Sequence, residues 1–395
     1  MKKRRVLFVT QSLQAAGVDN SLVTALNAAD SARFDVYVYP YTGQAGLADR
    51  VKAGINILLP SGRPHKYRDP LSLLLYLAVR ALGFLGLKKA ESKLNDRLTL
   101  LKRRTEADHY ARDIKSRGMD FDTVIAYDFG LSPEIASRLP AGKRLFFYHG
   151  SKDIYAGRKP HPFERFDCII GVSEGVTGML SSAYPGFKDR FVTLSNYVDM
   201  GEIKEKSGMY RPDLPPDATV LATSGRISRE KGFDLAVGAA AILKEKGFDF
   251  IWCFVGGGRE EAEIKELIKK KDLGDRVRVT GFLDNPYPYI ARCDLYVHTA
   301  LEESCSLSIM EAQRLGKAVV STATVGAKTL LSSDKSGILT GFSSEEIARG
   351  IIDLLTDAEK KKSSEGLFSE QDDIYLREQY IKGLNALLGD DRSDG

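Results

Sequence analysis

The chain has 395 residues and carries 57 Lys and Arg side chains against 53 Asp and Glu, a formal net charge of +4 that is too small to indicate a nucleic-acid-binding protein. Its 43% share of hydrophobic residues excludes a disordered chain, and its length predicts two or three compact domains. Residues 1–200 hold 30 basic and 20 acidic side chains, whereas residues 201–395 hold 27 and 33. The two halves are therefore expected to be different bodies.

The first half alternates short apolar runs with segments of helical periodicity. The runs predicted as strands are residues 6–9, 36–39, 55–59, 123–127, 144–148, 168–172 and 191–194. Strands that are apolar on both faces and separated by helices indicate a parallel sheet covered on both sides. We therefore predict a doubly wound, Rossmann-like α/β domain over residues 1–195.

Two features of the sequence predict a cytoplasmic protein. The basic N-terminus precedes an apolar run of five residues, which is too short for the core of a signal peptide. The four cysteines, Cys168, Cys253, Cys293 and Cys305, form no C-x-x-C pair and are expected to be buried thiols of a reducing compartment.

The most apolar stretch, residues 71–87, contains Arg80 and is shorter than the roughly 20 residues that a membrane-spanning helix needs. Around it, residues 63–104 carry eleven basic and three acidic side chains. Such a segment is either a core helix with a solvated basic edge or a surface for an anionic membrane. The sequence leaves both readings open. We expect peripheral binding at the inner membrane face, weakened by reversing Lys88, Lys89, Arg103 and Arg104 together.

The second half repeats the alternation after a polar linker at residues 196–216, which contains three prolines. Its predicted strands are residues 220–223, 250–255, 277–280, 295–298 and 318–321. We predict a second Rossmann-like domain over residues 217–370, followed at residues 371–395 by a helix that could pack back on the first domain and a polar tail. Ligands of open parallel sheets bind at the carboxyl ends of the strands, so the site is expected in a cleft between the two domains.

The motifs of several enzyme classes are missing. There is no G-x-G-x-x-G after the first strand, no G-x-x-x-x-G-K-[ST], no H-E-x-x-H and no cysteine and histidine cluster. The sequence therefore predicts no dinucleotide fingerprint, no P-loop and no metal site.

The stretch LEESCSLSIMEAQRL at residues 301–315 is the most informative. If Glu303 lies in a loop and a helix begins near Ser306, the N–H groups of the first turn point into the cleft, where they could hold a diphosphate. Glu303 would then lie at the mouth of the helix and Glu311 about one turn inside it.

Glu303 and Glu311, followed by the run Gly316–Val320, resemble the donor-binding motif of the GT-B retaining glycosyltransferases, family 4 (glycosyl transferases group 1). Further motifs occur in the order typical of that family. They are Gly17, His149 in Tyr-His-Gly, Gly171–Glu174, Ser195–Asp199, Ser224–Arg226, Glu230–Gly232, Val255–Gly258 and Thr280–Phe282.

The resemblance implies a role for each matching residue. Catalytic roles fall to His149, Glu303, Arg226 and Lys231: the two cations would bind the donor diphosphate, Glu303 the transferred sugar, and His149 the sugar or its phosphate. Glu311 would bind the ribose hydroxyls, and the remaining donor-binding residues would be Gly17, Gly256, Gly257, Phe282, Ser306 and Leu307. Each has a structural alternative, such as surface cations at a turn or ordinary turn glycines.

The function implied by the resemblance is transfer, with retention and without metal or cofactor, of a sugar from a nucleotide sugar, expected to be a UDP-sugar. The acceptor would be a hydroxyl of a lipid-linked, envelope or exopolysaccharide glycan, or of a protein. Two alternatives stay open: a catalytically silent GT-B partner of another glycosyltransferase, hinted at by Ser304-Cys305 in place of the family's usual Gly-Phe, and a UDP-sugar epimerase of related fold. Thr329, where many relatives carry glutamate, receives no interpretation.

Overall fold

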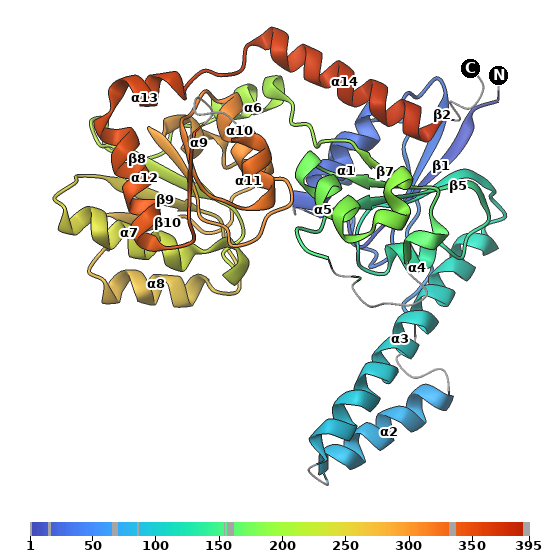
Figure 1. The fold of residues 1–395 in the computed structure, drawn as a ribbon. Helices are drawn as coiled ribbons and strands as arrows, with labels where there is room; N and C mark the ends of the chain where they lie inside the picture. The colour runs from blue at the N-terminus through green and yellow to red at the C-terminus, as the bar shows by residue number, and fades with distance from the viewer. Residues whose placement is uncertain are drawn as a thin grey trace.

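The computed structural model describes residues 2–14, 17–64, 70–84, 87–153, 155, 162–331 and 337–389. Parts of the predicted basic segment 63–104 and the tail from residue 390 lie outside the described residues. Within the described ranges the chain forms two α/β domains, each built on a parallel sheet (Figure 1).

The first domain contains a seven-stranded sheet with the order β3-β2-β1-β4-β5-β6-β7. All seven strands that the sequence predicts are present. Their bounds are β1 Arg4–Thr10, β2 Phe34–Pro40, β3 Asn56–Ile57, β4 Phe121–Ala126, β5 Ala141–Tyr148, β6 Cys168–Gly171 and β7 Phe191–Thr193. Val6, Leu7, Phe8 and Val9 of β1 have no exposed surface on either side, because helices cover both faces of the sheet.

Helices and short 3-10 turns complete this domain. They are α1 Gly17–Ala28, η1 Ala48–Arg50, α2 Pro70–Phe84, α3 Lys88–Ser116, α4 Ser132–Ala136, η2 Pro162–Arg165, α5 Glu174–Ala183 and η3 Pro185–Arg190. The core of the domain lies between the sheet and α1, α5 and the C-terminal half of α3, which contributes Ala107, Tyr110, Ala111 and Ile114.

The second domain contains a six-stranded parallel sheet with the order β10-β9-β8-β11-β12-β13. Its strands are β8 Val220–Ser224, β9 Ile251–Val255, β10 Val277–Val279, β11 Leu295–His298, β12 Val319–Thr322 and β13 Ile338–Thr340. The sequence missed β13, because a three-residue edge strand carries too little periodicity to be recognised. The helices are η4 Arg229–Lys231, α7 Phe233–Glu245, α8 Glu261–Lys270, α9 Tyr287–Arg292, α10 Leu307–Arg314, α11 Val325–Leu330, α12 Ser344–Thr356 and α13 Ala358–Ser363.

The chain crosses between the domains twice. The predicted linker is not irregular throughout, since it contains helix α6 (Met200–Ser207), which Asp199 caps at its N-terminus. Helix α14 (Glu370–Leu388) then returns to the first domain (Figure 1). There the Asn385 side chain accepts a hydrogen bond from the Asp30 N–H at 2.9 Å, and Lys143 donates to the Gly389 carbonyl at 2.9 Å.

Helices α2 and α3 form a hairpin that projects from the first domain, well beyond its sheet (Figure 1). Leu74, Leu77 and Phe84 of α2 are 63%, 54% and 94% exposed. The reading of residues 71–87 as a core helix is therefore wrong for the part of it that the structure describes. A search of the described helices finds none long and apolar enough to cross a membrane.

Candidate functional site

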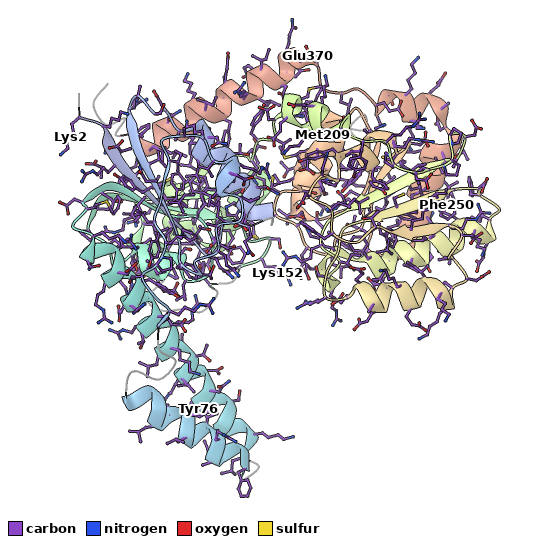
Figure 2. The ribbon with its side chains drawn as sticks, turned by 180° about the vertical axis from the view of Figure 1, so that it is seen from behind. Lys2, Tyr76, Lys152, Met209, Phe250 and Glu370 are labelled. Carbon is purple, nitrogen blue, oxygen red and sulfur yellow. The ribbon has the colours of Figure 1, made fainter. Side chains whose placement is uncertain are left out.

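The carboxyl ends of the two sheets meet at the domain boundary. Ser173, directly after β6, donates a hydrogen bond from its hydroxyl to the Ser304 carbonyl in the loop after β11, at 2.8 Å. Lys152, after β5, forms an ion pair with Glu302 of the same loop and is labelled at this boundary in Figure 2. The loops that carry the predicted site residues thus lie at facing edges, as the parallel topology predicts.

Two basic residues lie beside the Glu303 carboxyl. The Lys231 ammonium lies 2.5 Å from its Oε2, and the Nε2 of His298, at the end of β11, lies 3.8 Å from the same oxygen. Burial opposes ionisation of Glu303, but the polar surroundings, the His298 ring and above all the paired Lys231 ammonium, favour the carboxylate and lower its pKa to about 2. Glu303 is therefore a carboxylate, and its charge compensates the ammonium of Lys231.

His298 is a residue that the sequence analysis missed. It is 4% exposed, and its Nδ1 lies 3.2 Å from the Ser321 hydroxyl. Its buried Nε2 makes no hydrogen bond to any described residue. The distance of 3.8 Å from this nitrogen to the Glu303 Oε2 is too long for a hydrogen bond. A polar residue ending the apolar strand Leu295–His298 at its carboxyl end was the signal that could have identified it.

The loop from β8 to α7 presents Lys231 through tight backbone packing. Gly232 has a φ of +62°, and a Cβ there would lie 2.1 Å from the Thr299 carbonyl oxygen. The Thr299 hydroxyl donates to the Lys231 carbonyl at 3.0 Å. This glycine is therefore needed so that the loop can approach the end of β11 closely.

The glycines after β9 have similar packing reasons. A Cβ on Gly256 would lie 1.9 Å from the Gly225 carbonyl oxygen, and one on Gly257 would lie 3.0 Å from the Phe282 nitrogen. Close packing within the protein is thus enough to explain glycine at positions 256 and 257. In contrast, a Cβ on Gly17, the first residue of α1, would meet nothing within 4 Å, so the packing of the protein does not require glycine there.

Helix α10 begins at Leu307 with Ser306 as its N-cap, as the sequence predicts. The Ser306 hydroxyl accepts a hydrogen bond from the Ile309 N–H at 3.3 Å. The N–H groups of Leu307 and Ser308 have no acceptor within the helix, and they donate no hydrogen bond to any other described residue. The helix therefore starts at the domain boundary with two unpaired donors.

Glu311 lies in this helix with its carboxyl against α9. Its Oε1 accepts a hydrogen bond from the Tyr287 hydroxyl at 3.1 Å. Burial raises the pKa of Glu311 to about 7, even though the Tyr287 hydrogen bond and the charge of Arg50 favour the ionised form. A carboxyl that is only half ionised near neutral pH is the result.

His149 follows β5 at the carboxyl edge of the first domain. It is 8% exposed, and its Nε2 is buried without a hydrogen-bond partner among the described residues. Burial lowers the pKa of His149 to about 3, and the nearby Tyr127 backbone offsets this only in part. The imidazole is therefore neutral at physiological pH, and it carries no charge with which to stabilise a phosphate.

The remaining predicted residues differ in exposure. Arg226 is exposed, and its guanidinium makes no ion pair with a described residue. Phe282 is 61% exposed beside Gly257. Leu307 instead packs against the core of the first domain, so its side chain belongs to the domain interface and only its backbone is available to a ligand.

Both departures from the family pattern lie in the domain interface. Cys305 is 8% exposed and joins the core of the first domain. Gly175 of α5 sits so close to α11 that a Cβ on it would lie 2.9 Å from the Thr329 hydroxyl. Thr329 therefore lies at the close contact between α11 and α5.

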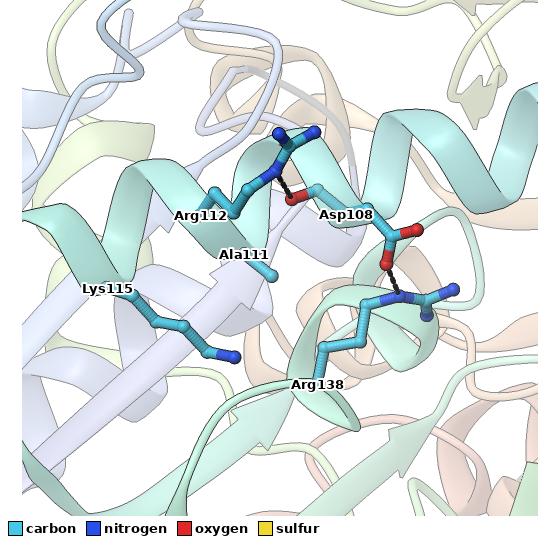
Figure 3. Close-up of a pocket in the computed structure, with 5 residues that line it drawn as sticks. All are labelled: Asp108, Ala111, Arg112, Lys115 and Arg138. Atoms are coloured by element: carbon cyan, nitrogen blue, oxygen red, sulfur yellow. Dashed lines mark hydrogen bonds and ion pairs between the residues drawn. The ribbon is translucent and has the colours of Figure 1, made fainter. Parts of the chain in front are cut away.

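Two cavities lie away from these residues. One of about 400 Å³ is lined by Asp108, Ala111, Arg112, Lys115 and Arg138 (Figure 3), and Arg138 binds Asp108 there at 2.5 Å. The other, of about 450 Å³, lies beside Arg144, Arg165 and Arg190. Among the described residues, no group of three His, Cys, Asp or Glu side chains is placed to hold a metal ion.

Comparison with known proteins supports the resemblance drawn from the motifs. Residues 210–365 match the sequence model of the family described as glycosyl transferases group 1. A search of curated proteins finds the lipopolysaccharide core biosynthesis glycosyltransferase LpsE of Rhizobium meliloti, 27% identical over 49% of this chain and 56% of that protein. It also finds a 4-alpha-N-acetylgalactosaminyltransferase of Campylobacter jejuni, named for a diphospho-undecaprenol-linked substrate and 27% identical over 51% of this chain and 54% of that protein.

The chain spans about half the length of the curated relatives it matches. Among solved structures, HepE of Anabaena in complex with UDP covers 96% of this chain and 97% of its own, with a TM-score of 0.65 and 17% identity. The two domains thus have the GT-B fold that the motifs imply, and the group 1 family resemblance is confirmed. The retaining, family 4 assignment stays a prediction.

Proposed function

We propose that this chain, which carries a group 1 glycosyltransferase domain in the GT-B fold, transfers a sugar from a UDP-sugar to a hydroxyl acceptor with retention. The observation that carries the proposal is the cluster at the facing sheet edges. Lys231 and Glu303 pair at 2.5 Å there, and α10 begins there with the unpaired N–H groups of Leu307 and Ser308.

The chemistry of the cluster suits a leaving nucleoside diphosphate. Negative charge grows on the leaving group as the glycosidic bond breaks, so preorganised positive groups accelerate the reaction. Arg226 is exposed and unpaired, and we assign it and Lys231 to the diphosphate together with the start of α10. The diphosphate would compete with Glu303 for the Lys231 ammonium.

The other residues are assigned by the hydrogen bonds that they can make. Glu303 is ionised and therefore an acceptor, which suits hydroxyls of the transferred sugar. Neutral His149 with an unpartnered Nε2 suits a sugar hydroxyl better than a phosphate. Glu311 is assigned to the ribose, Phe282 to the face of the base, and Gly17 to a close approach of backbone and phosphate.

The proposed acceptor rests on the names of the relatives, and the proposed membrane contact rests on a segment of the first domain. LpsE is named for lipopolysaccharide core synthesis and the Campylobacter enzyme for an undecaprenol-linked substrate. We therefore propose a lipid-linked or envelope glycan as the acceptor, and a cytoplasmic enzyme that binds the inner membrane face peripherally through residues 63–104.

Calorimetric titration with UDP tests the donor site. We expect Arg226→Ala to weaken binding about tenfold or more, because a charged hydrogen bond contributes about 1.5–3 kcal/mol. Arg229→Ala, which removes an exposed cation of the same loop, is the matched control and should bind as the parent does. Equal affinity of the parent and Arg226→Ala would overturn the assignment of the diphosphate.

Slow hydrolysis of UDP-sugars by the purified protein tests the activity. Hydrolysis that disappears in Glu303→Gln supports a transferase. Tight UDP binding without hydrolysis or transfer would favour the silent-partner alternative, and release of an epimerised sugar nucleotide without acceptor would favour the epimerase.

A further inference from the structure

The α2–α3 hairpin carries an apolar face that no described part of the chain covers. Positions 74, 77, 81 and 84 recur every three or four residues, so they share one side of α2. They are Leu74, Leu77, Ala81 and Phe84, all exposed, and Phe84 at the end of the helix is 94% exposed. Leu87, at the start of the return, is 51% exposed. A surface helix normally points a polar side to water. The half-buried residues of α2, Leu75, Tyr76, Ala78, Val79 and Leu82, are apolar as well, so the helix is apolar nearly all round and one apolar side is left uncovered.

Exposed cations lie on both helices of the hairpin. On α3, Lys93, Arg97 and Arg104 are exposed at helical spacing and share one side with Leu100, which is 63% exposed. Arg80 on α2 and Lys88 at the start of α3 are exposed as well. None of these five cations forms an ion pair with a described residue.

Two neighbouring cations, Arg103 and Lys102, make contacts within the protein instead. Arg103 binds Glu134 of α4 at 2.9 Å and donates to the Gly130 carbonyl at 2.7 Å, so it fastens α3 to the domain. Lys102 lies over the Tyr76 ring at 5.9 Å and links α3 to α2. Of the four cations whose reversal the sequence analysis proposed, Arg103 thus has a structural contact as well, and the side chain of Lys89 lies outside the described residues.

We propose that the α2–α3 hairpin docks on an anionic lipid bilayer, with Leu74, Leu77, Phe84 and Leu87 inserted at the interface. Arg80, on α2 between Leu77 and Phe84, and Lys88, beside Leu87, contact the headgroups, while Lys93, Arg97 and Arg104 on α3 add to the positive charge that attracts the anionic surface. This proposal rests on the membrane contact proposed above and specifies the element and side chains that make it. The hairpin belongs to the first domain (Figure 2), so docking holds the acceptor-side domain at the surface where a lipid-linked acceptor resides.

Charge decides between a bilayer and a second copy of the chain. The described side chains from residue 74 to residue 104 include the five free cations and the acidic Asp96. Two such hairpins packed face to face would bring like charges together, which opposes association. An anionic leaflet attracts the same charges while its hydrocarbon accepts the leucines and the phenylalanine.

Co-sedimentation of the full chain with vesicles tests the proposal. Vesicles of phosphatidylglycerol and phosphatidylcholine in equal parts are compared with pure phosphatidylcholine, at low and high salt. We expect the parent to pellet with the anionic vesicles and to be released by salt. The triple variant Leu74→Gln, Leu77→Gln, Phe84→Gln should lose affinity by about tenfold or more, and Lys93→Glu with Arg97→Glu should lose a similar factor.

Controls of matched chemistry lie on other helices. Ile374→Gln on α14 removes an aliphatic side chain that is 57% exposed, and Lys269→Glu with Lys270→Glu on α8 reverses two exposed cations; both should pellet as the parent does. The hairpin variants should keep the thermal stability and UDP affinity of the parent, so loss of lipid binding is distinguished from failure of the donor-site assignment.

Three results would overturn the proposal. They are absence of the parent from the anionic pellet at low salt, equal pelleting of the parent and the triple variant, and lipid-free dimers in sedimentation velocity that the triple variant abolishes. The last result would identify the apolar face as an interface between copies.

Discussion

Replacing Glu311 by glutamine should stabilise the empty protein while it weakens donor binding. The carboxyl titrates near 4.5 in the unfolded chain, and burial raises its pKa to about 7 in the folded protein. The unfolded chain therefore loses this proton first as the pH rises, so the folded state is destabilised progressively between pH 4.5 and 7 and by a constant amount above. Below pH 4.5 both states hold the proton and the effect vanishes.

The magnitude follows from the two pKa values. Their difference, 7 minus 4.5, is equivalent to about 3 kcal/mol at most. Glu311 retains some exposed surface, so solvent screening reduces this limit and we expect a gain of about 1–3 kcal/mol at pH 8 for Glu311→Gln. The amide oxygen can still accept the hydrogen bond from Tyr287, so the substitution removes the charge with little change in packing.

Urea denaturation at pH 4 and pH 8, followed by the fluorescence of Trp252, the single tryptophan, measures the effect. Glu263→Gln on α8 removes an exposed carboxylate and serves as the control, with stability unchanged at both pH values. UDP affinity of Glu311→Gln should fall about tenfold, because the amide lacks the charge that strengthens bonds to ribose hydroxyls. A variant whose stability tracks the parent at every pH would refute the reasoning about burial.

Three further predictions concern the same site. Lys231→Met should lower the free energy of unfolding by about 1–3 kcal/mol at pH 7, because it leaves the Glu303 carboxylate without its partner. The lowered pKa of Glu303 contributes stability above pH 4.5 that is lost as the pH falls toward 2, so urea denaturation should show a smaller loss at pH 3. An equal loss at both pH values would contradict the pairing. Gly232→Ala should cost more than about 1 kcal/mol, measured as a fall in Tm, whereas Gly186→Ala, whose Cβ would meet open space, should cost little. His149→Gln should lower UDP-sugar hydrolysis at all pH values between 5 and 8 without moving an inflection, because the pKa of His149 is about 3; an inflection near pH 6.5 that disappears in the variant would contradict this.

The sequence determined the fold class because the signal is local. Strand β9 is apolar throughout and β1 is apolar from Val6 to Val9, and a run of that kind predicts a strand buried on both faces whatever surrounds it. Ser306 likewise predicted the start of α10, since an N-cap is a contact between residues three apart. The short β13 and helix α6 were missed because neither carries enough apolar periodicity.

The candidate site depended on tertiary structure to a larger extent. The motifs named Lys231 and Glu303, but the contact between them joins residues 72 apart, and His298 entered the cluster only because β11 ends beside Glu303. The raised pKa of Glu311 and the lowered pKa of His149 likewise have burial as their main cause. Burial is a property of what surrounds a group, which no spacing of residues in the sequence specifies.

The α2–α3 hairpin is the clearest case in which the sequence did not specify burial. Leucines that recur every three or four residues predict a helix with an apolar side, and from the sequence that side could face a core or a membrane surface with equal justification. Only the folded chain decides whether another element covers it. Leu98 of α3 is 2% exposed, whereas Leu74 and Phe84 of α2 are 63% and 94% exposed, because among the described elements α2 packs mainly against α3 and extends beyond the domain (Figure 1). The sequence by itself determined that these residues form a helix, and the tertiary structure decided that its apolar side is uncovered.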